Sequence, residues 1–507
     1  MDYVIGADIG SQSVKAILLS VEGEYVGEDS QEYPIDYPHP LWAEQPVERW
    51  TNALTRAVRR LIQKTHVNSN NIRALALATQ VDGVVPVDSS GEALHPGIIW
   101  MDRRAEAQLQ GVEKTPGAAR AFALTGLNLD ATHVAPKIRW LMETHPEVAS
   151  RTQSYLLPGS YMACFLTREI AVDYSNASST LLLDVRTRNW SAEMCAAFGI
   201  DASQLAPVYA ATAPVGSLRP PIAEAMGLSL NTRVMVGCGD EHAACLGAGV
   251  VRPGLVGDIA GTAEPVGVVS AHPVFDPTRL LETHCHADPD VWLLENPGFV
   301  SGGNLRWYRE QFAHLEMQAA TEQNTSPYRL LDEKAALIPP GSEGVIFLPT
   351  LMGAMAPTWN ASARGTFFGF TLAHTRDHFF RAVLEGSAYA VRDNTDQMQA
   401  IGLQLEEIRV VGGGSKSPLW NQIKADVTGL PVAVPKITET TALGAAFLAL
   451  VGFGVYASLT EASEHMVRIA HRLEPNLETQ ARYQEAYQQY RRLYFSLLPV
   501  FEKVSQN

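Results

Sequence analysis

The chain has 507 residues, a net charge of −15 and an isoelectric point near 5.4. This length is too great for a single hydrophobic core, so two large domains are expected. With 46% hydrophobic and 18% charged residues the composition is that of a globular enzyme. The acidic charge argues against nucleic acid and against anionic membranes as partners.

The cysteines and the apolar segments indicate the compartment. The five cysteines are odd in number and form no CxxC pair, which favours a reducing compartment over a disulfide framework. No basic segment precedes the first expected strand, so no secretory signal is expected. The most apolar segment, residues 442–455, suits a buried helix and is too short for a membrane span. We therefore expect a cytoplasmic protein.

Residues 3–19 are predicted to form two strands joined by a polar turn, followed by a third strand after a turn at Gly23. The turn residues 10–13 (Gly-Ser-Gln-Ser) offer N–H and hydroxyl donors to a phosphate, and Lys15 adds a positive charge. Asp8 can hold Mg²⁺ through water. The chain contains no GxxxxGK[ST] loop, so this is not a Walker A motif.

Residues 42–63 are expected to form a loop and an amphipathic helix, and residues 74–78 a strand that leads to Asp82. Asp82 precedes a glycine at the carboxyl end of this strand, where it either binds a hydroxylated ligand or is a solvated turn residue. Trp100 either stacks on a ligand or is buried. Residues 118–187 are expected to contain helices and loops.

The pattern at residues 234–249 is a short strand, a glycine turn and a helix of small residues. It places Asp240 near the helix N-cap, at the carboxyl end of a strand, where open α/β sheets bind ligands. Backbone N–H groups and the helix dipole should keep this carboxylate ionised, and hence a weak base near neutrality. The alternative is a plain helix cap.

The opening pattern returns in the second half of the chain. Residues 258–268 echo residues 8–18, which suggests two halves of related topology that face each other across a cleft. We expect an N-terminal domain at residues 1–248 and a C-terminal domain at residues 249–507 that ends in a helical tail.

The second half also contains two glycine turns that enter helices, at residues 298–306 and 408–424. In the second turn, Ser417 is a good N-cap residue and Pro418 a good first helical residue. His284 and His286 could be metal ligands, but no further ligands occur at a suitable spacing. The tyrosines of the last helix, at residues 483–494, are expected to form a packing face.

Nine motifs in a fixed order carry a resemblance to a known family. They are Asp8–Lys15, Trp42–Gln45, Trp100–Arg104, Gly239–Ala244, Gly261-Thr262, Ser301–Trp307, Ala363–Phe370, Gly412–Ser415 and Ala442–Ala446. The chain resembles the FGGY carbohydrate kinase family over residues 3–452, and within it most closely the xylulokinases.

The resemblance implies an α/β fold of two ribonuclease H-like domains, as in actin-like ATPases, with sugar and MgATP in the interdomain cleft. It implies Asp240 as the catalytic base, and Mg²⁺ held by Asp8 and Asp240 through water. The implied contacts to ATP and its phosphates are Asp8, Gly10, Ser11, Ser13, Lys15, Gly261, Thr262, Gly302, Gly413, Gly414 and Ser417. The implied sugar contacts are Asp82, Trp100, Asp240 and Glu241.

Three departures from the xylulokinase pattern concern the substrate. Xylulokinases usually carry Gln-Met-His-Gly at residues 80–83, where this chain has Asp82, and Asp-Gln at residues 240–241, where it has Glu241. They often carry Gly-Glu-Arg-x-Pro at residues 353–357, where this chain has Gly-Ala-Met-Ala-Pro. Asp82 is acidic, as is the matching residue of glycerol kinases.

The resemblance implies phosphorylation of D-xylulose to D-xylulose 5-phosphate by ATP. Another pentulose, or a polyol such as erythritol or glycerol, stays open as the substrate, as does a non-catalytic sugar-sensing role. A homodimer is compatible with this interpretation.

Overall fold

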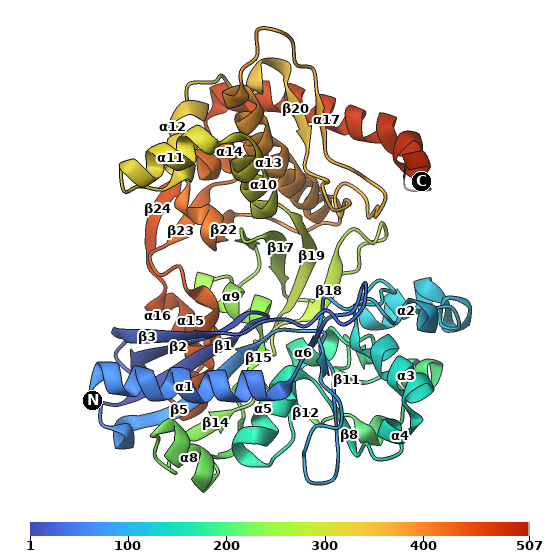
Figure 1. Cartoon of the computed structure of the whole chain (residues 1–507), viewed down its shortest axis with the longest axis vertical. Coiled ribbons are helices and arrows are strands. Elements are labelled where there is room, and N and C mark those ends of the chain that lie inside the picture. Colours follow the sequence, from blue (N-terminus) through green and yellow to red (C-terminus); the bar gives the residue numbers. More distant parts are fainter. Residues whose placement is uncertain (505–507) are drawn as a thin grey trace.

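The computed structural model describes residues 1–504, and these residues form two lobes, each built on a seven-stranded sheet (Figure 1). Residues 505–507 of the expected second domain lie outside the described residues. Across residues 1–504, no helix is both long and apolar enough to cross a membrane.

The first sheet has the strand order β13-β14-β5-β1-β2-β3, and β15 also pairs with β5. Its strands are β1 (Tyr3–Ile9), β2 (Ser13–Ser20), β3 (Tyr25–Glu32), β5 (Ile72–Thr79), β13 (Pro214–Ser217), β14 (Arg233–Met235) and β15 (Cys238–Gly239). β1 pairs with β2 in antiparallel and with β5 in parallel orientation, so the predicted hairpin is confirmed. The predicted amphipathic helix is α1 (Val47–Thr65), which buries Trp50, Leu54, Val58 and Leu61.

The second sheet has the strand order β18-β19-β17-β16-β22-β23-β24. Its strands are β16 (Leu255–Ile259), β17 (Ala263–Ser270), β18 (Glu282–Cys285), β19 (Trp292–Val300), β22 (Glu407–Val411), β23 (Val432–Pro435) and β24 (Ile469–Leu473). β16 pairs with β17 in antiparallel and with β22 in parallel orientation, as β1 does with β2 and β5. This shared central topology confirms that residues 8–18 and 258–268 belong to related halves.

The two related aspartates have different surroundings. Asp258 of β16 is fully buried and forms an ion pair with the equally buried Lys424, whose Nζ lies 2.6 Å from Oδ2. Lys424 also pairs with Glu264. Asp8 occupies the equivalent place in β1, but its Oδ1 has no hydrogen-bond partner among the described residues. Asp258 Oδ1 also lacks a hydrogen-bond partner, but the charge of Asp258 is balanced by Lys424, whereas no cation among the described residues forms an ion pair with Asp8.

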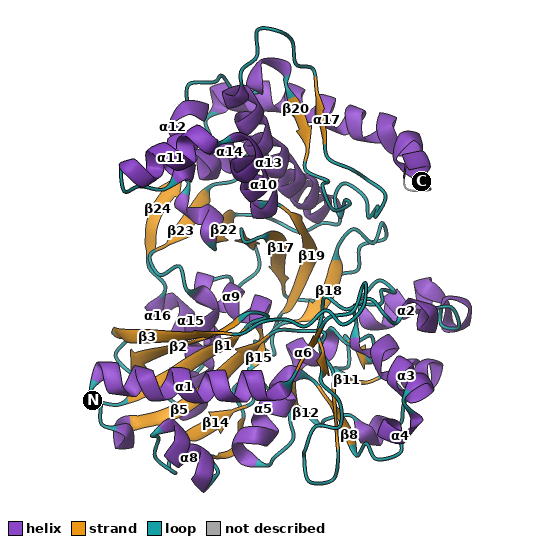
Figure 2. Ribbon diagram, viewed as in Figure 1, coloured by secondary structure: helices purple, strands orange, loops and turns teal. Residues whose placement is uncertain are grey.

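Helices surround both sheets (Figure 2). Those near the second sheet are α10 (Gly302–Phe312), α11 (His314–Glu322), α12 (Pro327–Ala335), α13 (Arg376–Ala400), α14 (Pro418–Thr428) and α17 (Leu477–Val504). α17 buries Tyr483, Tyr487, Tyr490 and Tyr494 in the second core, which confirms the predicted packing face. The first lobe continues with α2 (Ala118–Thr125), α3 (Val134–Thr144), α4 (Pro146–Ala149), α5 (Pro158–Thr167), α6 (Tyr174–Ser178), α7 (Ala192–Phe198) and α8 (Pro220–Met226).

The expectation of helices and loops alone in residues 118–187 is wrong, because three short strands occur there. They are β8 (Ser154–Leu156), β9 (Val172–Asp173) and β10 (Leu183–Asp184). β8 pairs with β6 (Val85–Val87), β9 with β12 (Val208–Tyr209) and β10 with β11 (Asn189–Trp190). Segments of two or three residues are too short to show a period of two in the sequence.

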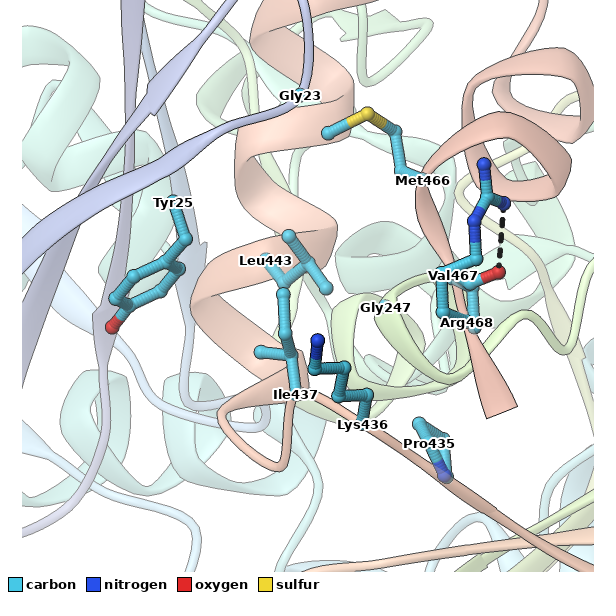
Figure 3. A pocket seen from close by; sticks show the side chains of 10 residues that line it. All are labelled: Gly23, Tyr25, Gly247, Pro435, Lys436, Ile437, Leu443, Met466, Val467 and Arg468. Carbon is cyan, nitrogen blue, oxygen red and sulfur yellow. Dashed lines mark hydrogen bonds between the residues drawn. The ribbon is translucent and has the colours of Figure 1, made fainter. Parts of the chain in front are cut away.

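The helix that follows β23 crosses back to the first sheet. α15 (Thr440–Phe453) and α16 (Leu459–Met466) pack with α9 (Asp240–Ala248) on strands β1 and β5 in one hydrophobic cluster. The chain thus passes between the lobes at residues 249–254, 436–439 and 467–468. A cavity of about 280 Å³ lies at these crossings, and Figure 3 shows Gly247, Lys436 and Val467 in its wall. The domain division at residue 248 stays a prediction.

α9 and α15 pack so closely that their glycines have no room for a side chain. A Cβ at Gly444 would lie 1.9 Å from the carbonyl oxygen of Ala243, and one at Gly247 would lie 2.0 Å from that of Thr440. The run of small residues that opens at Ala243 therefore serves close backbone contact between the two helices.

We expect Gly444→Ala to lower the stability of the first lobe. In an exposed helix this change would stabilise by about 1 kcal/mol, but here the methyl group meets backbone that cannot move aside, and overpacking costs about 1–3 kcal/mol or more. Calorimetry should show a lower midpoint of thermal unfolding. Gly111→Ala is the matched control, since its Cβ meets only the end of Arg139 at 3.4 Å. An unchanged midpoint for Gly444→Ala would contradict this account.

Candidate active site

Asp240 is the first residue of α9, directly after β15 and Gly239. The expectation that it lies near the N-cap is correct to one position: Gly239 is the N-cap residue, and the side chain of Asp240 makes no cap hydrogen bond. Its Oδ1 accepts a hydrogen bond from the backbone N–H of Glu241 at 3.0 Å. The half-buried Asp240 thus lies where β15 of the first sheet joins α9, the helix that leads to the second lobe.

The expectation that Asp240 behaves as an ordinary ionised carboxylate is wrong. Desolvation by the surrounding protein raises the pKa of Asp240 to about 7, the N–H of Glu241 opposes this only in part, and the charge of Asp82 adds to it. A single hydrogen bond in the first turn is too weak to offset the loss of water and a second negative charge. A base with a pKa near neutrality suits proton transfer better than a fully ionised aspartate.

Asp8 lies near Asp240. Burial raises the pKa of Asp8, the charge of Asp240 raises it further, and Lys15 opposes the shift. Its buried Oδ1 lacks a partner in the described part of the chain. Two neighbouring carboxylates with a free oxygen are a donor set that Mg²⁺ prefers, so these residues fit the ion that the sequence suggests.

The turn between β1 and β2 presents its polar groups to solvent. Gly10 N–H bonds the Ser13 carbonyl at 3.0 Å, which closes the turn, and Ser11 and Ser13 remain partly exposed. Trp100 donates from Nε1 to Ser11 Oγ at 2.7 Å and is 41% exposed, so the alternative of a buried Trp100 is wrong. Lys15 Nζ lies 2.6 Å from Glu439 Oε2, at the crossing that precedes α15.

The glycine turns of the second half, at Gly261, Gly302 and Gly414, are joined by backbone hydrogen bonds. Gly302 N–H donates to the Gly261 carbonyl at 3.1 Å, and Gly414 N–H donates to the Ala260 carbonyl at 2.9 Å. A Cβ at Gly302 would lie 2.3 Å from the Gly261 oxygen, so only glycine allows this approach. Thr262 is exposed at the tip of its turn.

The glycine turn before α14, which contains Gly413, leaves open space beside it. Gly413 is exposed and has nothing within 4 Å of a Cβ position, which leaves room for a flat ligand. Ser417 caps α14 as predicted: its Oγ accepts from the Trp420 N–H at 3.0 Å, and Pro418 is the first helical residue. The Ser417 oxygen is therefore partly engaged by the helix.

Asp82 is held by two residues that sequence reasoning missed. Its backbone adopts φ +56°, and the buried Lys137 donates from Nζ to its carbonyl at 2.7 Å, which holds this conformation. His133 Nδ1 lies 3.3 Å from Asp82 Oδ1, and although burial opposes the charge, Asp82 raises the pKa of His133 to about 9. The sequence did contain a signal for this buried cation, because Lys137 lies on the apolar side of α3, beside Ile138 and Leu141.

Glu241 faces the second lobe. Burial, the charge of Glu295 and the charge of Asp240 raise its pKa, and a hydrogen bond joins the Glu241 and Glu295 carboxyl groups. The metal interpretation of His284 and His286 gains no support, since in residues 1–504 no group of His, Cys, Asp and Glu could hold a metal ion by itself.

The structure thus combines a carboxylate with a pKa near neutrality, a second carboxylate with a free oxygen, and glycine turns in both lobes. These features fit a two-lobed phosphotransferase, a class of enzyme in which positioning and charge stabilisation supply most of the catalysis.

Comparisons with known proteins give the family. Residues 3–247 match the N-terminal domain, and residues 259–453 the C-terminal domain, of the FGGY family of carbohydrate kinases. The chain is 32% identical to the xylulose kinase of Lactococcus lactis, with 97% of each chain covered. It is 32% identical to the autoinducer-2 kinase of Salmonella paratyphi A (97% and 94% covered) and 30% identical to the gluconokinase of Bacillus subtilis (99% and 96% covered).

A solved structure agrees with this. The ligand-bound xylulose kinase of Lactobacillus acidophilus superposes with a TM-score of 0.91 at 25% identity and covers 99% of this chain and 100% of its own. The chain therefore belongs to the FGGY family of carbohydrate kinases. The predicted two-domain actin-like ATPase fold is confirmed, and so is the resemblance to the xylulose kinases.

Proposed function

We propose that the chain is an ATP- and Mg²⁺-dependent kinase of a small uncharged sugar, with D-xylulose, phosphorylated to D-xylulose 5-phosphate, as the first candidate. The observation that carries the proposal is Asp240, a carboxylate with a pKa of about 7 next to Asp8 and Asp82. A different pentulose or a polyol is the second candidate, favoured by the acidic Asp82.

Asp240 accepts the proton of the attacking sugar hydroxyl in this mechanism. General base catalysis of this kind contributes about 10²–10⁴-fold. The phosphates of ATP receive hydroxyl and N–H donors from Thr262, Gly413 and residues 10–13. Approach of the two lobes then excludes water from the site.

Asp8 and Asp240 are the residues that would hold Mg²⁺, through water. A bound Mg²⁺ ion would neutralise negative charge on the phosphate oxygens. Lys15 is tied to Glu439 in the structure, so its amino group is already oriented at the edge of the first phosphate turn.

Asp82 bears on the choice between a ketose and a polyol. An ionised aspartate only accepts hydrogen bonds, so it suits hydroxyl groups and not a bare carbonyl oxygen. His133, at 3.3 Å, is a donor beside it. A ketose can therefore bind with its hydroxyls on Asp82 and its carbonyl turned elsewhere, whereas a polyol needs no such orientation.

We expect Asp82→His to move selectivity toward D-xylulose relative to the best polyol by about tenfold, because a buried acceptor that faces a carbonyl costs about 1–3 kcal/mol. The ratio of kcat/KM for the two substrates, measured in wild type and variant, checks this. Asp290→His, at an exposed position, is the control. An equal ratio in all three proteins would mean that Asp82 is an ordinary turn residue.

A coupled assay of ADP release over ketopentoses, aldoses, polyols and gluconate tests the proposed function itself. Sugar-dependent ADP release with D-xylulose or a polyol is the expected result. Binding of sugars without any ADP release would instead support a sugar-sensing protein.

A further inference from the structure

Three side chains of the second lobe lie on one face of neighbouring strands. Glu282 and His284 are two residues apart on β18, so they point to the same side, and Glu295 of β19 stands directly opposite Glu282 in the strand register. Their exposed fractions are only 2%, 5% and 3%. We call these three residues the β18–β19 wall.

The β18–β19 wall meets the first lobe at the residues around Asp82. The backbone N–H of Asn128 donates to Glu282 Oε1 at 2.7 Å, and a hydrogen bond joins Glu295 to Glu241. The charge of Glu282 also acts on His133. The wall is therefore part of the same site as Asp82 and Asp240, although it comes from the other half of the chain.

His284 has unused hydrogen-bonding capacity. Both of its ring nitrogens are buried and have no hydrogen-bond partner among the described residues, and Nε2 is 3.4 Å from Glu295 Oε1 without hydrogen-bond geometry. Burial lowers the pKa of His284 to about 4, so the ring is neutral and offers one donor and one acceptor. Buried polar groups in proteins are nearly always paired, so such a ring indicates a ligand that supplies the partners.

Carboxyl groups outnumber cations around the β18–β19 wall. Carboxyl groups come from Asp82, Asp240 and Glu241 of the first half and from Glu282 and Glu295 of the second. The cations beside Asp82 are His133, at 3.3 Å from its Oδ1, and Lys137, which donates to its carbonyl at 2.7 Å. Burial raises the pKa of Glu282 and of Glu295 to about 7, so these carboxyl groups carry part of their negative charge near neutrality. They accept hydrogen bonds from hydroxyl groups, whereas a ligand carboxylate would add a further negative charge where little water screens it.

We propose that His284, Glu282 and Glu295 form the second lobe's wall of the sugar subsite, and that this wall selects an uncharged polyhydroxy substrate over a sugar acid. The inference rests on the proposed function and adds the substrate class and residues that the family motifs do not contain. Neutral His284 binds a hydroxyl or carbonyl oxygen, and the two glutamates disfavour an aldonate such as gluconate, although a gluconokinase is among the relatives.

The test is steady-state kinetics of the full-length protein with D-xylulose, erythritol and D-gluconate. We expect wild type to be active with an uncharged substrate and to reject gluconate. His284→Ala should raise KM for the uncharged substrate about tenfold and leave KM for ATP unchanged, because a lost polar contact to substrate is worth about that much. Glu282→Gln with Glu295→Gln should raise kcat/KM for gluconate relative to the uncharged substrate by about tenfold.

His284→Asn, which keeps a donor and an acceptor in a smaller side chain, should restore part of the sugar affinity and guards against a folding defect in the alanine variant. Glu406→Gln, on the exposed surface, is the control for loss of a negative charge. If wild type prefers gluconate, or if the wall variants leave sugar KM and the substrate ratio unchanged, the inference is overturned. Equal changes in both KM values, with lower thermal stability, would make the wall purely structural and would overturn it too.

These outcomes are distinct from failure of the proposed function. That failure would show as no ADP release by wild type with any sugar or polyol. A wild type that phosphorylates sugars, together with insensitive wall variants, would refute the inference alone.

Discussion

Asp240→Asn is expected to lower kcat for sugar phosphorylation by about 10²–10⁴-fold, while the fold and sugar binding are kept. The substitution is isosteric and removes the atom that would accept the proton of the attacking hydroxyl. Asn can still take the hydrogen bond that Glu241 N–H donates to Oδ1 at 3.0 Å, so the first turn of α9 should persist.

This loss should appear in kcat and in kcat/KM alike, because the base acts in the transition state and not in substrate binding. Rate measurements at saturating ATP, with sugar binding followed by calorimetry, separate the two effects. Asp290→Asn, in an exposed loop, is the matched control. Turnover close to that of wild type would show that another group accepts the proton.

Lys15→Ala and Thr262→Ala should each raise KM for ATP by about tenfold and leave KM for the sugar nearly unchanged, since a charge-assisted hydrogen bond is worth about 1.5–3 kcal/mol. Lys15 belongs to the first lobe and Thr262 to the second, so the two variants probe the same triphosphate from opposite sides. Because Lys15 is paired with Glu439, its removal also leaves that carboxylate without its partner at the turn.

Initial rates over a grid of ATP and sugar concentrations give both KM values for each variant. Lys503→Ala, near the exposed end of α17, controls for the loss of a positive charge. If either variant lost sugar affinity while its KM for ATP stayed normal, a triphosphate held between two turns would be untenable.

The sequence by itself determined the family and the longer, regular elements of local structure, but not the strands of two or three residues. The hairpin at residues 3–20, the amphipathic α1 and the Ser417 cap follow from short-range periodicity and from hydrogen bonds between near neighbours. The repeat of the opening pattern at residues 258–268 was enough to predict two related halves, since it marks the same two central strands in each sheet.

Only the tertiary structure decided the chemistry of these residues. The pKa of Asp240 depends on how much protein replaces water around it and on the charge of Asp82, which is distant in sequence. Lys15 pairs with Glu439, more than 400 residues later in the chain, and Glu241 of the first lobe meets Glu295 of the second. Desolvation and Coulomb interactions depend on distances in space, which a pattern along the chain does not contain.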